Sequence, residues 1–230
     1  PKTVMDAVLK VDKHRTFPKY ASKTFEKWCK KNVAAFQNSF PRHVSMFHGC
    51  YVNYNYPQLG KDLVSVMNAL GYGVHLLENE KCCGTALISN GMIDQAKRNA
   101  ANNIESMRKS VYERQMPVIS TSSSCTFTMR DEYPHLLGVK NEDVRDYIEL
   151  ATRFIYKLID QDKVKLVFKK GYKAKVAYHT PCHMERLGWG IFSTELIKMI
   201  PGVELTVLDS NCCGIAGTYG FKKENYEVSQ

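Results

Sequence analysis

The sequence has no run that approaches the roughly 18 apolar residues of a membrane-spanning helix. Its first residues also lack the charged-then-apolar pattern of a secretory signal. The hydrophobic share of 44% and the charged share of 24% are ordinary for a folded globular protein, so disorder is not a serious interpretation. We therefore expect the chain as given to be soluble and intracellular.

A nucleic-acid-binding motif is also lacking, although the net charge is +9. Nucleic acid therefore ranks last among the partners that a basic protein could bind. The basic residues are scattered apart from a group near Lys27 and a group from Lys169 to Lys175. Two interpretations stay open: a patch that docks on an anionic membrane surface or an acidic protein, and a solvated basic face.

The chain begins at Pro1 and stops at Gln230, inside a polar stretch with a helical pattern. We expect residues to be missing at both ends.

The cysteines form a pattern that occurs twice. Cys82-Cys83-Gly84 returns as Cys212-Cys213-Gly214, and a lone cysteine precedes each pair, Cys50 by 32 residues and Cys182 by 30. Chance is a poor explanation for two such units, and the better competing interpretation is buried structural cysteine. The chain therefore consists of two copies of one unit.

The first copy has the pattern of a parallel α/β unit. Short apolar runs predict strands at residues 43–48, 74–77 and 117–121, and apolar spacing predicts helices between Pro57 and Gly71 and over residues 94–111. This alternation is the signature of a parallel sheet with right-handed crossovers. The predicted fold class is α/β, with two pseudo-repeated βαβ-type units.

Each predicted strand of the first copy is followed by cysteine. Ligands collect outside the carboxyl ends of the strands in such sheets. The sequence therefore predicts that four cysteines meet at one edge: Cys50, Cys82, Cys83 and Cys125.

The second copy is shorter. A long helix predicted over residues 141–159 leads to strands at 176–181 and 203–208 with a helix at 187–200 between them. No third strand with a cysteine follows, so this unit is expected to be truncated, with Cys182, Cys212 and Cys213 as part of a second site. We divide the chain into a basic N-terminal segment (1–42), a first unit (43–170) and a second unit (171–230).

The cysteines favour metal or redox chemistry, because disulfides are rare in a reducing compartment. Adjacent cysteines fit a single zinc ion poorly, since their side chains diverge, and suit two metal atoms of an iron–sulfur cluster better. Zinc and a metal-free redox thiol stay as alternatives. Cys29, in a predicted short basic helix over residues 24–36, lies outside the repeat and is not expected to be a ligand.

Two histidines, His48 and His179, take matching places before the first cysteine of their unit. Either could donate to a cluster sulfur or a substrate, and the simpler interpretation is that each satisfies a local backbone group.

The doubled pattern resembles the cysteine-rich CCG domain family, which includes the CCG-bearing component of heterodisulfide reductase and the iron–sulfur component of glycolate oxidase. The segments that carry this resemblance are residues 47–55, 126–136, 179–184 and 212–223.

The resemblance implies an electron-transfer subunit with an iron–sulfur cluster, of [4Fe-4S] type, held by the CCG cysteines. It also implies flavin-containing dehydrogenase subunits as electron donors, a membrane quinone as acceptor, and a peripheral place on the cytoplasmic face of the membrane. In this chain Cys50, Cys82, Cys83 and Cys125 would form the complete site, and Cys182, Cys212 and Cys213 the partial one.

Two departures from the family pattern bear on this expectation. Ser122 takes the place of the first cysteine in the family's late C-x-x-C motif, so the first cluster could be smaller or differently ligated. The ferredoxin-like cysteine runs expected before Pro1 are absent from the sequence given. Two further hypotheses are a zinc-stabilised docking scaffold and an enzyme that reduces a disulfide or quinone at the cysteine edge.

Overall fold

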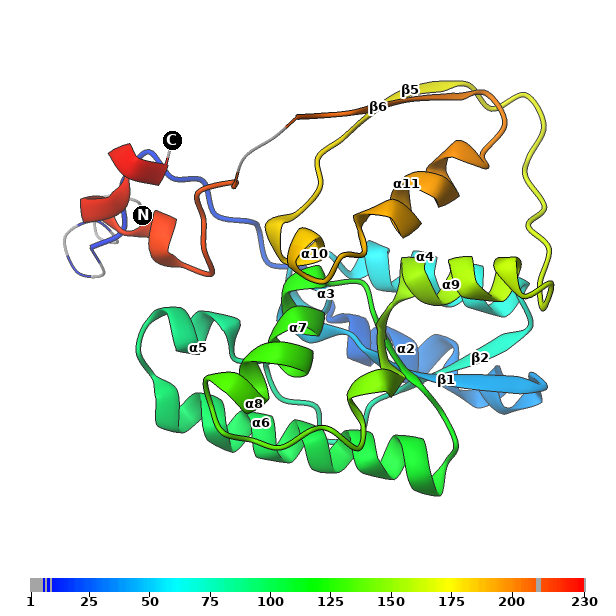
Figure 1. The fold of residues 1–230 in the computed structure, drawn as a ribbon, viewed down its shortest axis with the longest axis horizontal. Coiled ribbons are helices and arrows are strands. Elements are labelled where there is room, and N and C mark those ends of the chain that lie inside the picture. Colours follow the sequence, from blue (N-terminus) through cyan, green and yellow to red (C-terminus); the bar gives the residue numbers. More distant parts are fainter. Residues whose placement is uncertain (1–5, 7, 9, 210–211, 230) are drawn as a thin grey trace.

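The chain forms a four-stranded sheet followed by a two-stranded sheet, and every strand pair in both is parallel (Figure 1). The structure is a computed structural model that describes residues 6, 8, 10–209 and 212–229. The larger sheet has the order β2-β1-β3-β4 and the smaller one pairs β5 with β6. The strands are β1 (Arg42–Phe47), β2 (Tyr72–Leu76), β3 (Val118–Ser120), β4 (Ile148–Leu150), β5 (Ala174–Tyr178) and β6 (Val203–Val207). The predicted α/β class with parallel strands is confirmed.

Helices alternate with these strands. The α-helices are α2 (Phe25–Asn32), α3 (Gly49–Tyr54), α4 (Pro57–Ala69), α5 (Thr85–Ser89), α6 (Ile93–Arg108), α7 (Ser123–Phe127), α8 (Tyr133–His135), α9 (Ala151–Asp160), α10 (Cys182–Arg186) and α11 (Gly190–Lys198). Short 3₁₀ turns lie at Ala34–Ser39, Arg145–Tyr147, Tyr219–Phe221, Lys223–Asn225 and Glu227–Ser229, and π turns at Lys109–Glu113 and Thr128–Glu132.

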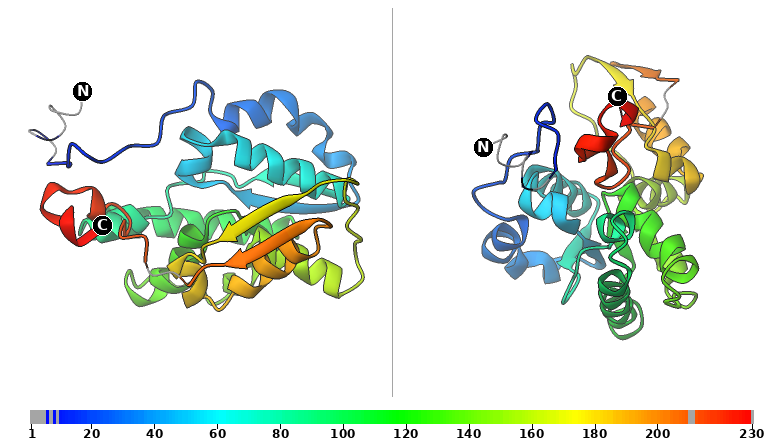
Figure 2. Two further views of the ribbon diagram at one scale, coloured as in Figure 1. Left: turned by 90° about the horizontal axis from the view of Figure 1, so that it is seen from above. Right: turned by 90° about the vertical axis from the view of Figure 1, so that its left-hand side faces the viewer.

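Two apolar clusters enclose the larger sheet. On one face α2, α4 and α9 pack against Val44, Met46 and Val74. On the other face α6 and α8 pack against Phe47 and Val118. The sheet is thus the middle of three layers, as Figure 2 shows from two further sides.

Helix α4 begins at Pro57, as predicted, because proline suits the first helical turn. Its buried face carries Leu63, Val64 and Met67, whereas Val66 is exposed.

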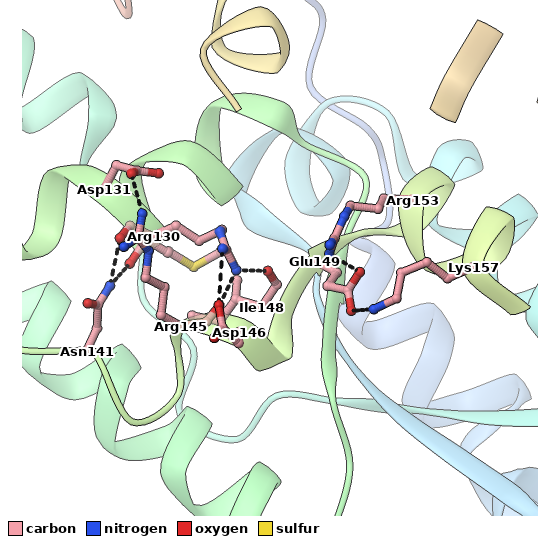
Figure 3. Close-up of polar contacts among 10 residues, drawn as sticks. Arg130, Asp131, Asn141, Arg145, Asp146, Ile148, Glu149, Arg153 and Lys157 are labelled. Carbon is pink, nitrogen blue, oxygen red and sulfur yellow. Dashed lines mark hydrogen bonds and ion pairs between the residues drawn. The ribbon is translucent and has the colours of Figure 1, made fainter. Parts of the chain in front are cut away.

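The predicted long helix over residues 141–159 is wrong. The segment forms a 3₁₀ turn, then β4, and only then α9. The Arg130 guanidinium donates to the backbone carbonyls of Arg145 and Ile148, which fixes the extended approach to β4 (Figure 3). Asn141 Nδ2 donates to the Met129 and Arg130 carbonyls at 2.6 and 3.0 Å and holds the preceding loop. The apolar spacing looked helical because residues from two different elements fell in register.

The second unit repeats the first in its order of elements. Helix α10 follows β5, as α3 follows β1, and α11 lies against both β6 and α9. Ser193 Oγ donates to Thr152 Oγ1 at 3.0 Å, which links α11 to α9.

The two ends of the described chain lie side by side (Figure 1). Val11 forms an antiparallel bridge with Lys222, and the Phe17 and Phe221 rings stack with their centroids 4.9 Å apart.

Among the described helices, none has the length and apolar character needed to cross a bilayer. The division into residues 1–42, 43–170 and 171–230 stays a prediction.

Candidate iron–sulfur site

The cysteines follow the carboxyl ends of strands, as predicted. Cys50 lies in the first turn of α3 after β1, and Cys125 lies in α7 after β3. Cys82 and Cys83 lie in the loop between β2 and α5. Helices α3, α7 and α10 come together at this edge (Figure 1).

The four sulfur atoms of the first unit form a row of hydrogen bonds, from Cys50 to Cys82, from Cys82 to Cys83, and from Cys83 to Cys125. Donation from the Cys50 and Cys83 thiols lowers the pKa of Cys82 to about 2. The same bonding from Cys83 lowers the pKa of Cys125. The hydrogen bond to Cys82 and burial raise the pKa of Cys50, and bonding to Cys125 raises the pKa of Cys83. The predicted set of four cysteines is therefore brought together.

Glycines allow this close approach. Gly49 has φ of +69°, and a Cβ there would lie 3.4 Å from Cys125 Sγ. Gly84 has φ of +99° directly after the cysteine pair, where it begins α5. A side chain is disfavoured at both positions, so glycine lets the backbone turn next to the sulfurs.

The described residues contain no group of three or more His, Cys, Asp or Glu side chains placed to hold one metal ion. Cys125 is also close enough to Cys50 and Cys82 to interact with both electrostatically, so the four sulfurs form one group.

Two asparagines one turn apart on α6 hold the loop that carries Cys82. Asn99 Nδ2 donates to the Cys82 carbonyl at 3.1 Å. Asn103 accepts the Lys81 N–H at 2.8 Å and donates to the Lys81 carbonyl at 3.0 Å. Neither asparagine was predicted from the sequence; the one signal is that Asn103 falls on the apolar face of the predicted helix with Ala100 and Met107, where a polar side chain needs a buried partner.

Asn103 also reaches Tyr133, a fully buried tyrosine beside the sulfurs. Its Nδ2 donates to the Tyr133 hydroxyl at 3.0 Å. Burial raises the pKa of Tyr133 well above its usual value, and the nearby Cys83 adds to that effect. Tyr133 is thus neutral and packs against the cysteine edge.

Hydroxyl groups extend the polar network from Cys83. The Cys83 sulfur lies 3.3 Å from Thr85 Oγ1, which lies 2.7 Å from Thr128 Oγ1. Thr128 in turn donates to the Glu132 carboxylate. This chain connects α5 to the π turn after α7 and gives the buried sulfur a polar neighbour.

Ser122 lies at the site without occupying a sulfur's place in the row. Its Oγ accepts the Cys125 N–H at 3.2 Å and caps the N-terminus of α7. It also forms a hydrogen bond with the Cys125 side chain, which contributes to the lowered pKa of that thiol.

His48 satisfies a backbone group, as the simpler interpretation held. Its Nδ1 lies 3.0 Å from the Gly49 carbonyl oxygen and 3.1 Å from Glu80 Oε1, and burial lowers its pKa. His48, Cys50, Glu80 and Cys82 line a cavity of about 680 Å³. His179 is half-buried in the second unit.

The three cysteines of the second unit also lie together. Partial desolvation is the main cause of the raised pKa of Cys182, and Cys212, to which it is hydrogen-bonded, and Cys213 add to the effect. All three are exposed.

The cysteine segments of the two units are in contact. His183, next to Cys182, places Nδ1 2.8 Å from Ser124 Oγ and stacks on Phe127 with ring centroids 5.0 Å apart. Helices α7 and α10 are therefore packed together at the cysteine edge.

Cys29 lies elsewhere, in the apolar cluster beneath α2. It is 2% exposed, and burial raises its pKa to about 11. It lies outside the row of sulfurs.

The chain is similar over most of its length to several known proteins. It is 56% identical over 227 residues to a subunit of the anaerobic glycerol-3-phosphate dehydrogenase of Escherichia coli K12, an alignment that covers 99% of this chain and 57% of the relative. It is 34% identical over 188 residues to lactate utilization protein A of Bacillus velezensis, covering 78% of the chain and 75% of the relative. It is 32% identical over 185 residues to a subunit of the dihydromethanophenazine:CoB–CoM heterodisulfide reductase of Methanosarcina mazei, covering 76% and 43%.

The chain thus spans little more than half the length of its glycerol-3-phosphate dehydrogenase relative. The family model for the cysteine-rich CCG domain matches residues 44–130 and 176–230, and these two ranges contain both copies of the cysteine pattern. The chain belongs to the cysteine-rich CCG domain family.

Proposed function

We propose that this chain is the cluster-binding part of an electron-transfer subunit in an anaerobic glycerol-3-phosphate dehydrogenase. The observation that carries the proposal is the grouping of four cysteines behind the carboxyl ends of β1, β2 and β3, where a Cβ at Gly49, next to Cys50, would lie 3.4 Å from Cys125 Sγ. The similarity to the glycerol-3-phosphate dehydrogenase relative, at 56% identity, favours that complex over the lactate utilization and heterodisulfide reductase systems, where identity is 34% or less.

The residues present suit an iron–sulfur cluster. All four donors are cysteines, whose deprotonated thiolates are the ligands of [4Fe-4S] clusters. The donors would be Cys50, Cys82, Cys83 and Cys125. Such a cluster supplies a centre that accepts and releases single electrons, while the protein fixes the ligands and sets the polarity around them.

Side chains of this chain fix the backbone of the cysteine loop and place a polar group beside one of its sulfurs. Asn99 and Asn103 hold the backbone of the cysteine pair, and the Thr85 hydroxyl lies beside the Cys83 sulfur. Hydrogen bonds to ligating sulfurs and exclusion of water both tune the potential of such centres. Cys50 is exposed and Cys82 is half-buried, which leaves a route from this edge toward a redox partner.

The proposed electron path runs from a flavin-containing subunit through this chain to a membrane quinone. The net charge of +9 and the exposed lysines from Lys169 to Lys175 suit peripheral contact with the anionic cytoplasmic surface of the membrane.

The test is reduction by the physiological donor. The cluster-loaded protein is mixed anaerobically with the flavin-containing subunits and glycerol 3-phosphate, and the visible absorption of the cluster is followed. We expect bleaching that depends on both the flavin subunits and the substrate. A cluster that dithionite bleaches but the donor system leaves unchanged would contradict the assignment to this complex. Stoichiometric zinc without sulfide would favour the docking scaffold instead.

A further inference from the structure

Glu80 joins the two loops that carry the cysteines of the first unit. It lies two residues before Cys82, in the loop after β2, and its side chain reaches the start of α3. Its Oε1 accepts the Gly49 N–H at 2.8 Å, and its Oε2 accepts the His48 N–H at 3.0 Å. Both carboxylate oxygens are therefore bonded to the backbone immediately before Cys50.

The two hydrogen bonds of Glu80 lie in a largely buried place, where water has little access to replace them. The Glu80 side chain is only 7% exposed, and His48 Nδ1 lies 3.1 Å from Oε1. Burial raises the pKa of Glu80 well above its ordinary value, whereas the bonds from the Gly49 and His48 N–H groups act in the opposite direction and favour the ionised carboxylate. The two backbone N–H groups at the start of a helix would lack a partner without it.

The second unit lacks this arrangement at the level of sequence. The residue that precedes Cys182 is Pro181, which has no N–H to donate, where the first unit has Gly49. The residue two before Cys212 is Ser210, which has no carboxylate, where the first unit has Glu80. The carboxylate and one of the two backbone donors are thus absent from the matching positions of the second copy, where Thr180 keeps its N–H and the nearest carboxylate, Asp209, lies one residue earlier.

We propose that Glu80 is a positioning residue that clamps the Cys50 loop to the Cys82-Cys83 loop, so that the four sulfurs of the first unit keep the spacing that a cluster requires. The inference rests on the proposed cluster-binding function, which it deepens by naming a residue outside the ligand set. Glu80 acts through the backbone of its neighbours and is not one of the four proposed ligands.

The variant Glu80→Gln tests the clamp. An amide places an NH₂ group against one of the two backbone N–H donors in either orientation, so one bond is lost at nearly unchanged volume. Loss of a residue that orients metal ligands typically costs 10–100-fold in metal affinity. We expect iron loss to a chelator to become at least about 10-fold faster, with an altered electron paramagnetic resonance signal of the reduced protein.

Glu78→Gln is the matched control. Glu78 lies in the same loop, but its side chain is 54% exposed and pairs with Arg114 at the surface. We expect this variant to keep the chelation rate and the spectrum of the unmodified protein. Equal chelation rates and equal spectra for Glu80→Gln and the unmodified protein would overturn the proposal.

Amide hydrogen exchange of the metal-free chain tests the clamp without the cluster. The His48 and Gly49 amides should be protected in the unmodified protein, and at least one should lose protection in Glu80→Gln. If the His48 and Gly49 amides of the unmodified protein exchanged as fast as unbonded loop residues, the clamp would be refuted. This outcome does not depend on whether Glu80→Gln folds. If the unmodified protein took up no iron, the proposed function would fail, and the exchange result would still decide whether Glu80 holds the two loops.

Discussion

At the scale of single residues, two buried cysteines have different surroundings. Cys83 is 4% exposed and Cys29 is 2% exposed, so burial alone does not distinguish them. Cys83 contacts other sulfurs and the Thr85 hydroxyl, whereas Cys29 packs among apolar side chains. Whether a buried cysteine can bind a metal or take part in redox chemistry therefore depends on the groups around its sulfur, and not on how deeply it is buried.

We expect Cys83→Ser to abolish iron binding by the first site, because it removes one of the four proposed ligands. Cys29→Ala should keep the iron content of the unmodified protein, since this thiol serves only packing. Iron and acid-labile sulfide per chain, measured after identical anaerobic reconstitution, provide the comparison. Equal losses in the two variants would mean that folding rather than ligation is affected.

Ser122 gives a second prediction at this scale. Its hydroxyl caps α7 and bonds to Cys125, so Ser122→Ala should lower the free energy of unfolding by about 1 kcal/mol, the usual effect of losing an N-cap. Iron content should be unchanged, because the serine is not expected to be a ligand. Chemical denaturation and an iron assay check the two parts, and loss of iron with unchanged stability would show instead that Ser122 ligates the metal.

At the scale of elements, the strands and helices around the cysteines were predictable from short-range pattern. The strand preceding Cys50, the helix opened by Pro57 and the strand preceding Cys125 all appear close to their expected positions. The region before α9 was not predictable, because β4 depends on pairing with β3 and on the Arg130 contacts, which join residues well separated in sequence. Glu80, Asn99 and Asn103 were missed for the same reason, since their partners are set by tertiary packing.

Glu149 gives the prediction for β4 and α9. It is buried in β4, and its carboxylate bonds to Arg153 and Lys157 of α9 (Figure 3). Glu149→Ala leaves both cations without their partner and should lower the free energy of unfolding by about 1–3 kcal/mol. Glu142→Ala, at an exposed position nearby, should change it by less than about 0.5 kcal/mol. Urea denaturation of the metal-free variants measures both, and equal effects would refute the structural role of Glu149.

At the scale of the whole molecule, the two copies of the cysteine pattern are unequal. The first brings four sulfurs together, whereas the second brings three exposed cysteines together in the described part of the chain. The Ser124–His183 contact places the two sets next to each other. A cluster held by this chain should accordingly occupy the first set.

We expect Cys212→Ser to keep most of the iron and the spectrum of the unmodified protein. The reason is that Cys212 belongs to the incomplete set. Iron assay and electron paramagnetic resonance of the reduced protein, measured beside Cys83→Ser, provide the comparison. Loss of all iron in Cys212→Ser would place the cluster in the second unit or between the two.

The most direct test of the central claim is the iron and acid-labile sulfide content of the unmodified protein, purified and reconstituted without oxygen. The account predicts a coloured protein that holds iron and sulfide in roughly equal amounts and loses both when Cys83 is replaced by serine. A colourless protein without sulfide would contradict it, as would iron and sulfide that persist unchanged in the Cys83→Ser variant.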